Sequence, residues 1–175
     1  MLVGRRCAGD LADGTTDRLS SDVAPLAQLQ APLGTYFVTG NHEYYSGVES
    51  WTDTAKSLGF EVLINEGRLL ELGDSRIALA GVTDYSAGEL IPDHSSDPEQ
   101  ALASAGSADL RILLAHQPRS IEAASRANCH LQLSGHTHGG QFIPWKYLIP
   151  LQQPFVAGLH KFRDTWIYVH RGTGY

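Results

Sequence analysis

The sequence predicts an α/β fold, and three observations carry this prediction. Stretches typical of β-strands alternate along the chain with stretches of helical spacing, which indicates a layered architecture. The chain has 175 residues, a length that suits one domain with a single core. No linker, internal repeat or low-complexity segment divides it. We therefore expect residues 1–175 to form a single domain.

The elements can be assigned in order along the chain. Tyr36–Thr39 is an aromatic and β-branched run that ends at Gly40, which predicts a buried strand. Apolar residues then recur at helical spacing, and Gly59 follows as a helix stop. Gly73-Asp74-Ser75 predicts a hairpin turn. The predicted strands are 36–39, 61–64, 68–72, 76–82, 110–115, 131–133 and 165–169, and the predicted helices are 48–58, 97–106 and 120–126.

Composition excludes several classes of protein. Apolar residues make up 42% of the chain, which is too much for an intrinsically disordered protein. A net charge of −6 argues against a nucleic-acid polymer as a partner. No apolar run is long enough for a transmembrane helix, and Cys7 and Cys129 cannot make a disulfide framework. We expect a cytoplasmic protein, or one that is membrane-associated through parts outside this chain.

Histidines gather in loops that follow the predicted strands. In α/β folds, binding sites lie at the carboxyl ends of the strands. The set comprises His42, His116, His136 and His138, together with Asn41, Asp10 and Asp13. Imidazole, carboxylate and amide groups together suit Mn, Fe or Zn. Each loop alone could be an ordinary turn or hold a structural histidine, but their combination favours one shared metal site.

Four segments in this order resemble motifs of the calcineurin-like metallophosphoesterase superfamily. They are Gly9-Asp10-Leu11-Ala12-Asp13, Gly40-Asn41-His42-Glu43, the solitary His116, and Gly135-His136-Thr137-His138. Gly139-Gly140-Gln141, residues 151–155 and Arg171-Gly-Thr-Gly174 resemble a bacterial subgroup, the YkuE-like, often membrane-anchored phosphoesterases. The resemblance implies a four-layer α-β-β-α sandwich, with two mixed sheets flanked by helices and incomplete at both termini.

The resemblance also implies a centre of two divalent ions, Mn, Fe or Zn, that hydrolyses a phosphomonoester or phosphodiester. Asp10 would bridge both ions. Asn41, His116 and His136 would complete one site, and His138 would belong to the other. His42 would donate a proton or hydrogen bond to the phosphate, and Glu43 or Asp13 would orient these groups. Two ions about 3.5–4 Å apart can activate a bridging water and hold the phosphoryl oxygens.

The sequence departs from the superfamily pattern at its first motif. The Asp-x-His motif is absent, because residues 1–8 contain neither aspartate nor histidine. Arg5-Arg6-Cys7 also interrupts the apolar run expected of a buried central strand. We expect a chain truncated at both ends, which binds one metal well and is weakly active or inactive.

An apolar stretch, residues 142–156, directly follows the histidine loop. It is either a loop folded over the core or a hydrophobic wall that contacts a lipid-linked substrate or a membrane surface. The resemblance extends to enzymes that cleave UDP-diacylglucosamine in lipid A synthesis, which implies a nucleotide–lipid pyrophosphate as one candidate substrate. His94, His130, His160 and His170 are interpreted as surface or structural residues, and Asp84 as a polar strand end or part of the cleft.

Two other classes stay open. A structural zinc or iron domain is disfavoured, because such sites are rich in cysteine and both cysteines lie outside the motifs. A non-catalytic metal-binding scaffold with a defective first metal site is the stronger alternative, since the first motif is missing.

Overall fold

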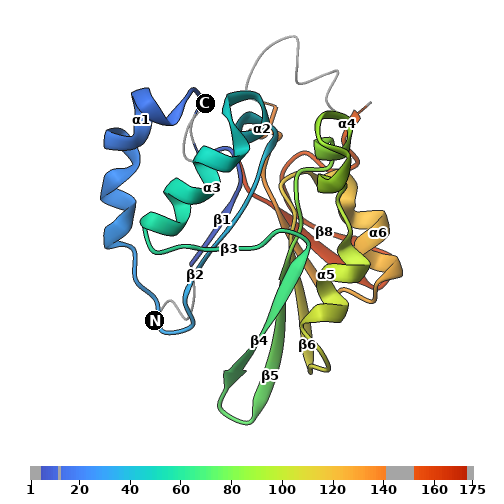
Figure 1. Cartoon of the computed structure of the whole chain (residues 1–175). Helices are drawn as coiled ribbons and strands as arrows, with labels where there is room; N and C mark the ends of the chain where they lie inside the picture. The colour runs from blue at the N-terminus through green and yellow to red at the C-terminus, as the bar shows by residue number, and fades with distance from the viewer. Residues whose placement is uncertain (1–4, 12, 141–151, 173–175) are drawn as a thin grey trace.

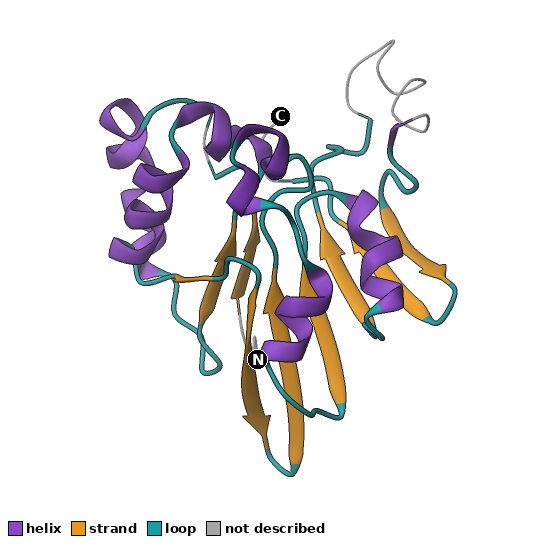
Figure 2. Ribbon diagram, turned by 45° about the vertical axis from the view of Figure 1, so that its right-hand side comes forward, coloured by secondary structure: helices purple, strands orange, loops and turns teal. Residues whose placement is uncertain are grey.

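Two β-sheets lie face to face, and helices cover the outer face of each sheet (Figures 1 and 2). This computed structural model describes residues 5–11, 13–140 and 152–172. The order of layers is the α-β-β-α sandwich that the sequence analysis expects, so the predicted fold class is confirmed.

The smaller sheet is parallel throughout its described strands. Its strands, in spatial order, are β1 (Arg5–Ala8), β2 (Thr35–Val38) and β3 (Glu61–Val62). The segments that join them contain α1 (Thr16–Val23), η1 (Ala24–Gln28), α2 (Asn41–Ser46) and α3 (Val48–Ser57). Parallel neighbours need such crossover connections. The expected mixed character therefore applies to the larger sheet and not to this one.

The larger sheet has parallel inner strands and an antiparallel pair at each edge. In spatial order it contains β4 (Glu66–Leu72), β5 (Ser75–Gly81), β6 (Leu110–Leu114), β7 (Leu131–Ser134), β9 (Thr165–Val169) and β8 (Gly158–Phe162). The predicted hairpin joins β4 to β5, with Gly73 at a φ of +61° in its turn. Since β5, β6, β7 and β9 are parallel, their carboxyl ends share one edge of the sheet.

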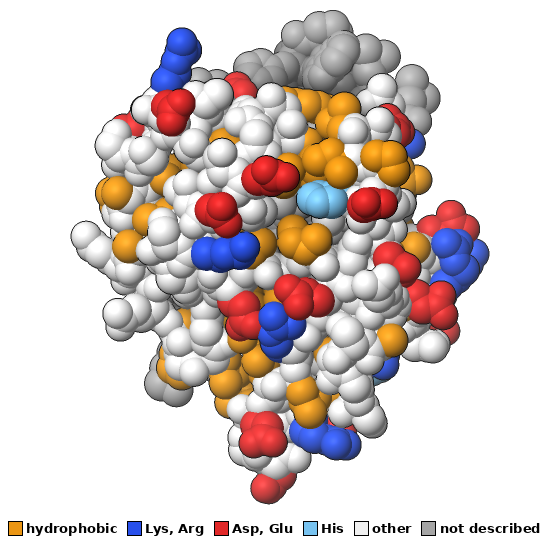
Figure 3. Space-filling view, viewed as in Figure 1, with side chains coloured by type: hydrophobic (Ala, Val, Ile, Leu, Met, Phe, Trp, Pro, Cys, Tyr) orange, Lys and Arg blue, Asp and Glu red, His pale blue; other side chains and the backbone are white. Residues whose placement is uncertain are grey.

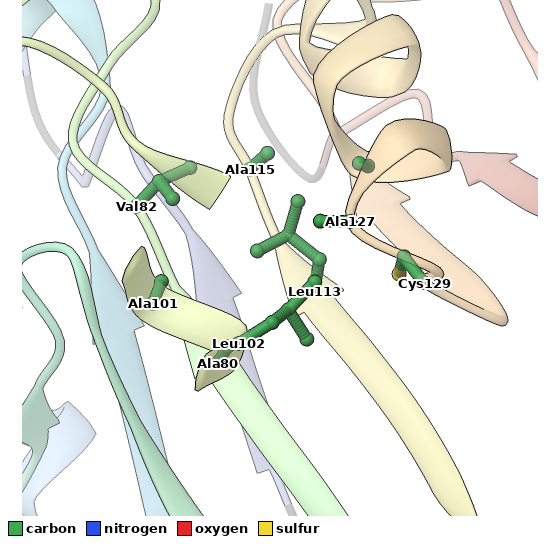
Figure 4. Packing of buried hydrophobic residues seen from close by; sticks show 9 residues of the cluster. Ala80, Val82, Ala101, Leu102, Leu113, Ala115, Ala127 and Cys129 are labelled. Carbon is green, nitrogen blue, oxygen red and sulfur yellow. The ribbon is translucent and has the colours of Figure 1, made fainter. Parts of the chain in front are cut away.

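The core fills the three spaces between the layers. Phe37 packs outward with Ala55 of α3, whereas the neighbouring Val38 packs inward with Leu79 and Leu114 of the larger sheet. This alternation follows from the two-residue period of a strand. On the far face of the larger sheet, Leu113 packs against helices (Figure 4). These helices are α5 (Pro98–Ser104) and α6 (Ile121–Arg126).

A local signal in the sequence explains where α5 begins. The Asp97 carboxylate accepts a hydrogen bond from the Gln100 amide at 2.9 Å and caps α5, with Pro98 at the first helical position. Short helical segments also surround the loops that follow β5 and β6: α4 (Ala87–Leu90), η2 (Pro92–His94) and η3 (Pro118–Ser120).

The sequence analysis missed β1, β8 and the helices α1, α2 and α4. Arg5-Arg6-Cys7 does not suit a central strand, but β1 is the edge of the smaller sheet within the described residues, where one neighbour suffices. The segment after β2 was expected as a loop. It starts a helix at Asn41, because the Glu43 carboxylate accepts a hydrogen bond from the Gly40 amide at 2.6 Å.

Most of the predicted apolar stretch, residues 142–151, lies outside the described residues. Phe155, which is described, stacks on the His160 ring at 4.8 Å and packs beside buried Ile167. In the described ranges, none of the helices has both the length and the apolarity to cross a membrane. On the face seen in Figure 3, acidic and basic side chains are interspersed.

Candidate metal centre

Four predicted metal ligands follow four parallel strands and meet where the two sheets converge. Asp10 and Asn41 come from the smaller sheet, after β1 and β2. His116 and His136 come from the larger sheet, after β6 and β7. We call Asp10, Asn41, His116 and His136 the four-residue cluster.

The potential ligand atoms of this cluster lie close together. Nε2 of His116 is 3.0 Å from Oδ2 of Asp10, 3.2 Å from Oδ1 of Asn41 and 3.1 Å from Nδ1 of His136. Nδ1 of His136 is 3.0 Å from Oδ1 of Asn41. An ion about 2.1 Å from each ligand in octahedral geometry keeps adjacent ligand atoms about 3.0 Å apart. The observed separations therefore match the edges of a coordination shell.

The potential ligand atoms around Nε2 of His116 outnumber the N–H groups that could donate hydrogen bonds to them. His116 donates from Nδ1 to the Ala8 carbonyl at 2.6 Å, so its Nε2 faces the cluster. A single proton on Nε2 can satisfy only one of the three acceptors around it. A cation is attracted by all of them at once, which makes the donor set a good fit for a divalent metal.

The titration behaviour of the cluster also fits a cation site. Burial lowers the pKa of His136 to about 4, with help from the positive charge of His116, so its imidazole is neutral at pH 7. Burial alone would lower the pKa of His116, but the Asp10 hydrogen bond and charge outweigh it and raise this pKa. Burial opposes ionisation of Asp10, yet hydrogen bonds from His116 and the His42 amide hold its pKa below the usual value. Asp10 is therefore anionic.

The backbone around the centre is strained. Asp10, His136 and His138 have φ values of +53°, +68° and +48°, in the left-handed region that non-glycine residues seldom adopt. Such conformations cost about 1–3 kcal/mol each and concentrate at functional sites. The fold therefore holds these three side chains at positions that ordinary strands or helices would not give.

Glycines let the loops of the two sheets approach. A Cβ on Gly9 would lie 2.5 Å from the Gly40 amide nitrogen and 2.7 Å from Nδ1 of His116. A Cβ on Gly40 would clash with the Asp10 side chain. Any larger residue at either position would push Asp10 away from its partners.

Glu43 ties the two ligand loops of the smaller sheet together. Its fully buried carboxylate accepts hydrogen bonds from the amides of Asp10 at 3.0 Å, Leu11 at 2.7 Å and Gly40 at 2.6 Å. Burial raises the pKa of this carboxyl, and the amide hydrogen bonds only partly offset the rise. Glu43 therefore links the backbone that follows β1 to the backbone that follows β2.

His42, Asp13 and His138, which we call the flanking group, lie around the four-residue cluster. Nδ1 of His42 is 2.9 Å from Oδ1 of Asp13, and the His42 side chain is 36% exposed. His138 has a buried Nδ1 without a hydrogen-bond partner in the described part of the chain. The group of three close acidic and histidine ligands in these residues contains Asp10, His116 and His136 but not His138. An unpaired buried nitrogen is costly unless a ligand completes it.

Sequence reasoning named two residues near the centre, Asp84 and His170, but left both out of the predicted site. Asp84 is fully buried after β5, and both of its oxygens lie 3.1 Å from the Gln117 amide nitrogen, next to His116. Its charge acts to raise the pKa values of His116 and His136. An aspartate directly after an apolar strand was the available signal. His170, interpreted as a surface or structural residue, lies against Gly135 of the histidine loop.

The comparisons with known proteins agree with this geometry. Residues 7–140 match the family described as Calcineurin-like phosphoesterase. The chain therefore belongs to the calcineurin-like phosphoesterase family.

Similar full-length proteins occur in animals and bacteria. The chain is 44% identical over 178 residues to "Transmembrane protein with metallophosphoesterase domain" of Bos taurus, covering 95% of this chain and 40% of that protein. It is 32% identical over 174 residues to "Uncharacterized metallophosphoesterase YkuE" of Bacillus subtilis, covering 95% and 59%. The chain thus spans less than two thirds of these relatives. The YkuE resemblance is confirmed, but the similarity extends beyond the expected bacterial subgroup.

Solved structures share the fold at low identity. A 5'-nucleotidase precursor from Thermus thermophilus matches with a TM-score of 0.61 and 19% identity, covering 94% of this chain and 38% of that one. The sulfate thiohydrolase SoxB, from the same organism, matches with a TM-score of 0.61 and 16% identity, covering 94% and 33%. These two matches support the architecture alone.

Proposed function

We propose that residues 1–175 form a single domain that hydrolyses phosphoesters with the aid of divalent metal ions. The observation that carries this proposal is the convergence of the four-residue cluster, with its ligand atoms 3.0–3.2 Å apart. Divalent ions bound there would polarise the phosphoryl oxygens and lower the pKa of a water molecule.

The side chains divide the work as follows. Asn41, His116 and His136 would hold one ion, and Asp10 would be shared with a second ion that His138 would help to bind. His42 donates a hydrogen bond or proton to the ester oxygen that gains charge, and Asp13 at 2.9 Å from Nδ1 keeps its ring oriented. Glu43 acts through the backbone, because its hydrogen bonds keep Asp10 facing the larger sheet.

The substrate is a phosphomonoester or phosphodiester, and a nucleotide-linked or lipid-linked substrate is our finer proposal. The nucleotidase fold of a structural neighbour supports the nucleotide arm of this proposal by analogy only. Contact with a membrane surface through residues 142–156 remains part of the lipid arm. Parallel assays with a 5'-nucleotide and a lipid-linked pyrophosphate separate the two arms.

The experiment is metal content together with turnover of bis-p-nitrophenyl phosphate in added Mn. We expect the wild-type chain to bind metal and turn over, and Asp10→Asn to lose both properties, because the variant keeps the shape but loses the bridging charge. Asp53→Asn, at an exposed pair with Lys56, is the matched control. Turnover that survives Asp10→Asn would refute the proposal.

The second candidate function is a metal-binding scaffold without catalysis. It is favoured by one observation: residues 1–8 contain neither aspartate nor histidine, so among residues 1–175 the motifs offer the second ion only Asp10 and His138. One tightly bound ion per chain with no turnover would select this scaffold, whereas two ions with turnover would select the hydrolase.

A further inference from the structure

The chain that follows β9 lies beside the histidine loop. β7 and β9 are parallel neighbours with Ser134 opposite Val169, so both end at the edge that carries the metal centre. The His170 amide donates a hydrogen bond to the Ser134 carbonyl at 2.9 Å, which extends this pairing by one residue. Residues 170 and 171 are therefore held next to residues 135–139.

Arg171 crosses this loop at Gly139, directly after His138. Cγ and Cδ of Arg171 each lie 3.0 Å, and Nε 3.2 Å, from the place where a Cβ on Gly139 would be. Gly139 has a φ of +66°, which a side chain would strain. The aliphatic part of Arg171 thus rests on a surface that is open only because residue 139 is glycine.

The charge of Arg171 has no partner in the described residues. Three other arginines are paired there: Arg68 with Glu61 and Glu66, Arg126 with Glu122, and Arg119 with the Tyr85 ring. Arg171 is exposed and takes part in none of the ion pairs, hydrogen bonds or ring contacts of the described chain. The Arg171 guanidinium is therefore free to bind an anion near the histidine loop.

We propose that Arg171 binds the non-ester oxygens of the phosphoryl group, on the His138 side of the metal centre. The guanidinium is planar and always charged, and its fork of N–H donors matches two phosphoryl oxygens. The contact with Gly139 fixes the stem, so less side-chain freedom is lost when an anion binds. This inference rests on the proposed function for the identity of the anion, because a phosphoester hydrolase must bind a phosphoryl group.

The test measures binding of inorganic phosphate to the Mn-loaded chain by calorimetry, with metal content determined in parallel. Arg171→Met keeps the stem that contacts Gly139 and removes the charge. We expect it to weaken phosphate binding by about 10–100-fold, as loss of a charge-assisted hydrogen bond does, with metal content unchanged. Arg171→Lys keeps a point charge and should lie between Met and wild type. Arg76→Met, at the opposite end of the sheet on β5, is the control.

Kinetics separates this inference from the proposed function. If the chain hydrolyses bis-p-nitrophenyl phosphate, Arg171→Met should raise KM and weaken inhibition by phosphate. Equal phosphate affinity in wild type and Arg171→Met, or absence of phosphate binding to the Mn-loaded wild type, would overturn the role of Arg171. Loss of metal together with phosphate would also overturn it, in favour of a structural role. Arg171-dependent phosphate binding without turnover would support Arg171 while refuting the proposed function.

Discussion

The four-residue cluster and the flanking group differ in how firmly the fold holds them. The cluster takes two ligands from each sheet, and His116 spans the sheets by its hydrogen bond to the Ala8 carbonyl at 2.6 Å. In the flanking group, His42 contacts Asp13, whose side chain is 85% exposed. Within the described residues, Nδ1 of His138 has no hydrogen-bond partner.

This difference shows which part of a strand-end site a fold preorganises. Ligands that cap buried parallel strands inherit the rigidity of both sheets, and the buried Glu43 carboxylate locks their loops. The side chains of the flanking group lie one to three residues further along, and they depend on local contacts or on a bound ion. In the proposed two-ion centre, the fold would therefore prepare one ion site in advance, and the second site would form only when its ion binds.

The largest expected effect comes from removing the central ligand of the cluster. We expect His116→Gln to lower Mn affinity by more than about 100-fold, the upper range for loss of an outer partner of a metal ligand. The reason is that Nε2 of His116 contacts the other three members of the cluster. Calorimetric titration with Mn measures the effect, and the exposed His130→Gln is the control. Wild-type affinity in His116→Gln would remove the cluster from the metal site.

Glu43→Gln tests whether the hydrogen bonds to the Glu43 carboxylate hold the four-residue cluster in place. Glutamine has one acceptor oxygen and turns an N–H₂ group toward backbone amides, so the three hydrogen bonds cannot all persist. We expect about 2–4 kcal/mol less unfolding free energy and about 10–100-fold weaker metal binding.

Urea denaturation of the metal-free chain measures the stability change, and Glu49→Gln on the exposed face of α3 is the matched control. A Glu43→Gln variant with the stability and metal affinity of the control would show that the segments after β1 and β2 keep their positions without the Glu43 hydrogen bonds.

The same contrast explains what the sequence could predict. Asn41, His116 and His136 follow predicted strands, and the shared edge of parallel strands was enough to expect them together, whereas Asp10 was expected from its place in the family motif. The strand β1 was not expected, because sequence pattern cannot tell an edge strand from a central one when the neighbouring strands are unknown. Glu43 was expected to orient the site, but its hydrogen bonds to backbone amides were not expected. Its contacts depend on α2 starting at Asn41, which brings a helical residue back to the Gly40 amide.

His138→Ala tests whether the four-residue cluster can bind its ion without the flanking group. We expect the affinity for the first ion to stay within about twofold of wild type, as for substitutions that share no direct contact with that site. If a second ion binds, the metal content should fall from two ions to one, because His138 is its histidine ligand in the proposal. Metal analysis after dialysis gives the count, and Mn titration gives the first affinity. A large loss of the first ion would mean that both groups form one indivisible site.

The smallest expected effect is the release of a proton from the cluster when a metal ion binds. Burial would lower the pKa of His116, but the Asp10 hydrogen bond and charge raise it above its ordinary value of 6.5, so the metal-free protein keeps the second imidazole proton to a higher pH than a free histidine does. His136, with a pKa of about 4, is already a neutral imidazole at pH 7 and has no second proton to lose. Metal ligation needs neutral imidazoles, so below the pKa of His116 we expect metal binding to release up to about one proton per ion, and the metal affinity to rise with pH until His116 is itself neutral.

Calorimetry in two buffers of different ionisation enthalpy counts these protons. Asp10→Asn removes the main cause of the raised pKa, so His116 should deprotonate at lower pH in this variant, and any residual metal binding near pH 7 should release fewer protons. Proton release by wild type that stays at zero between pH 6 and 7 would contradict the exchange. It would mean that both imidazoles of the cluster are already neutral before the ion binds. The surrounding backbone alone would then hold the short distances around Nε2 of His116.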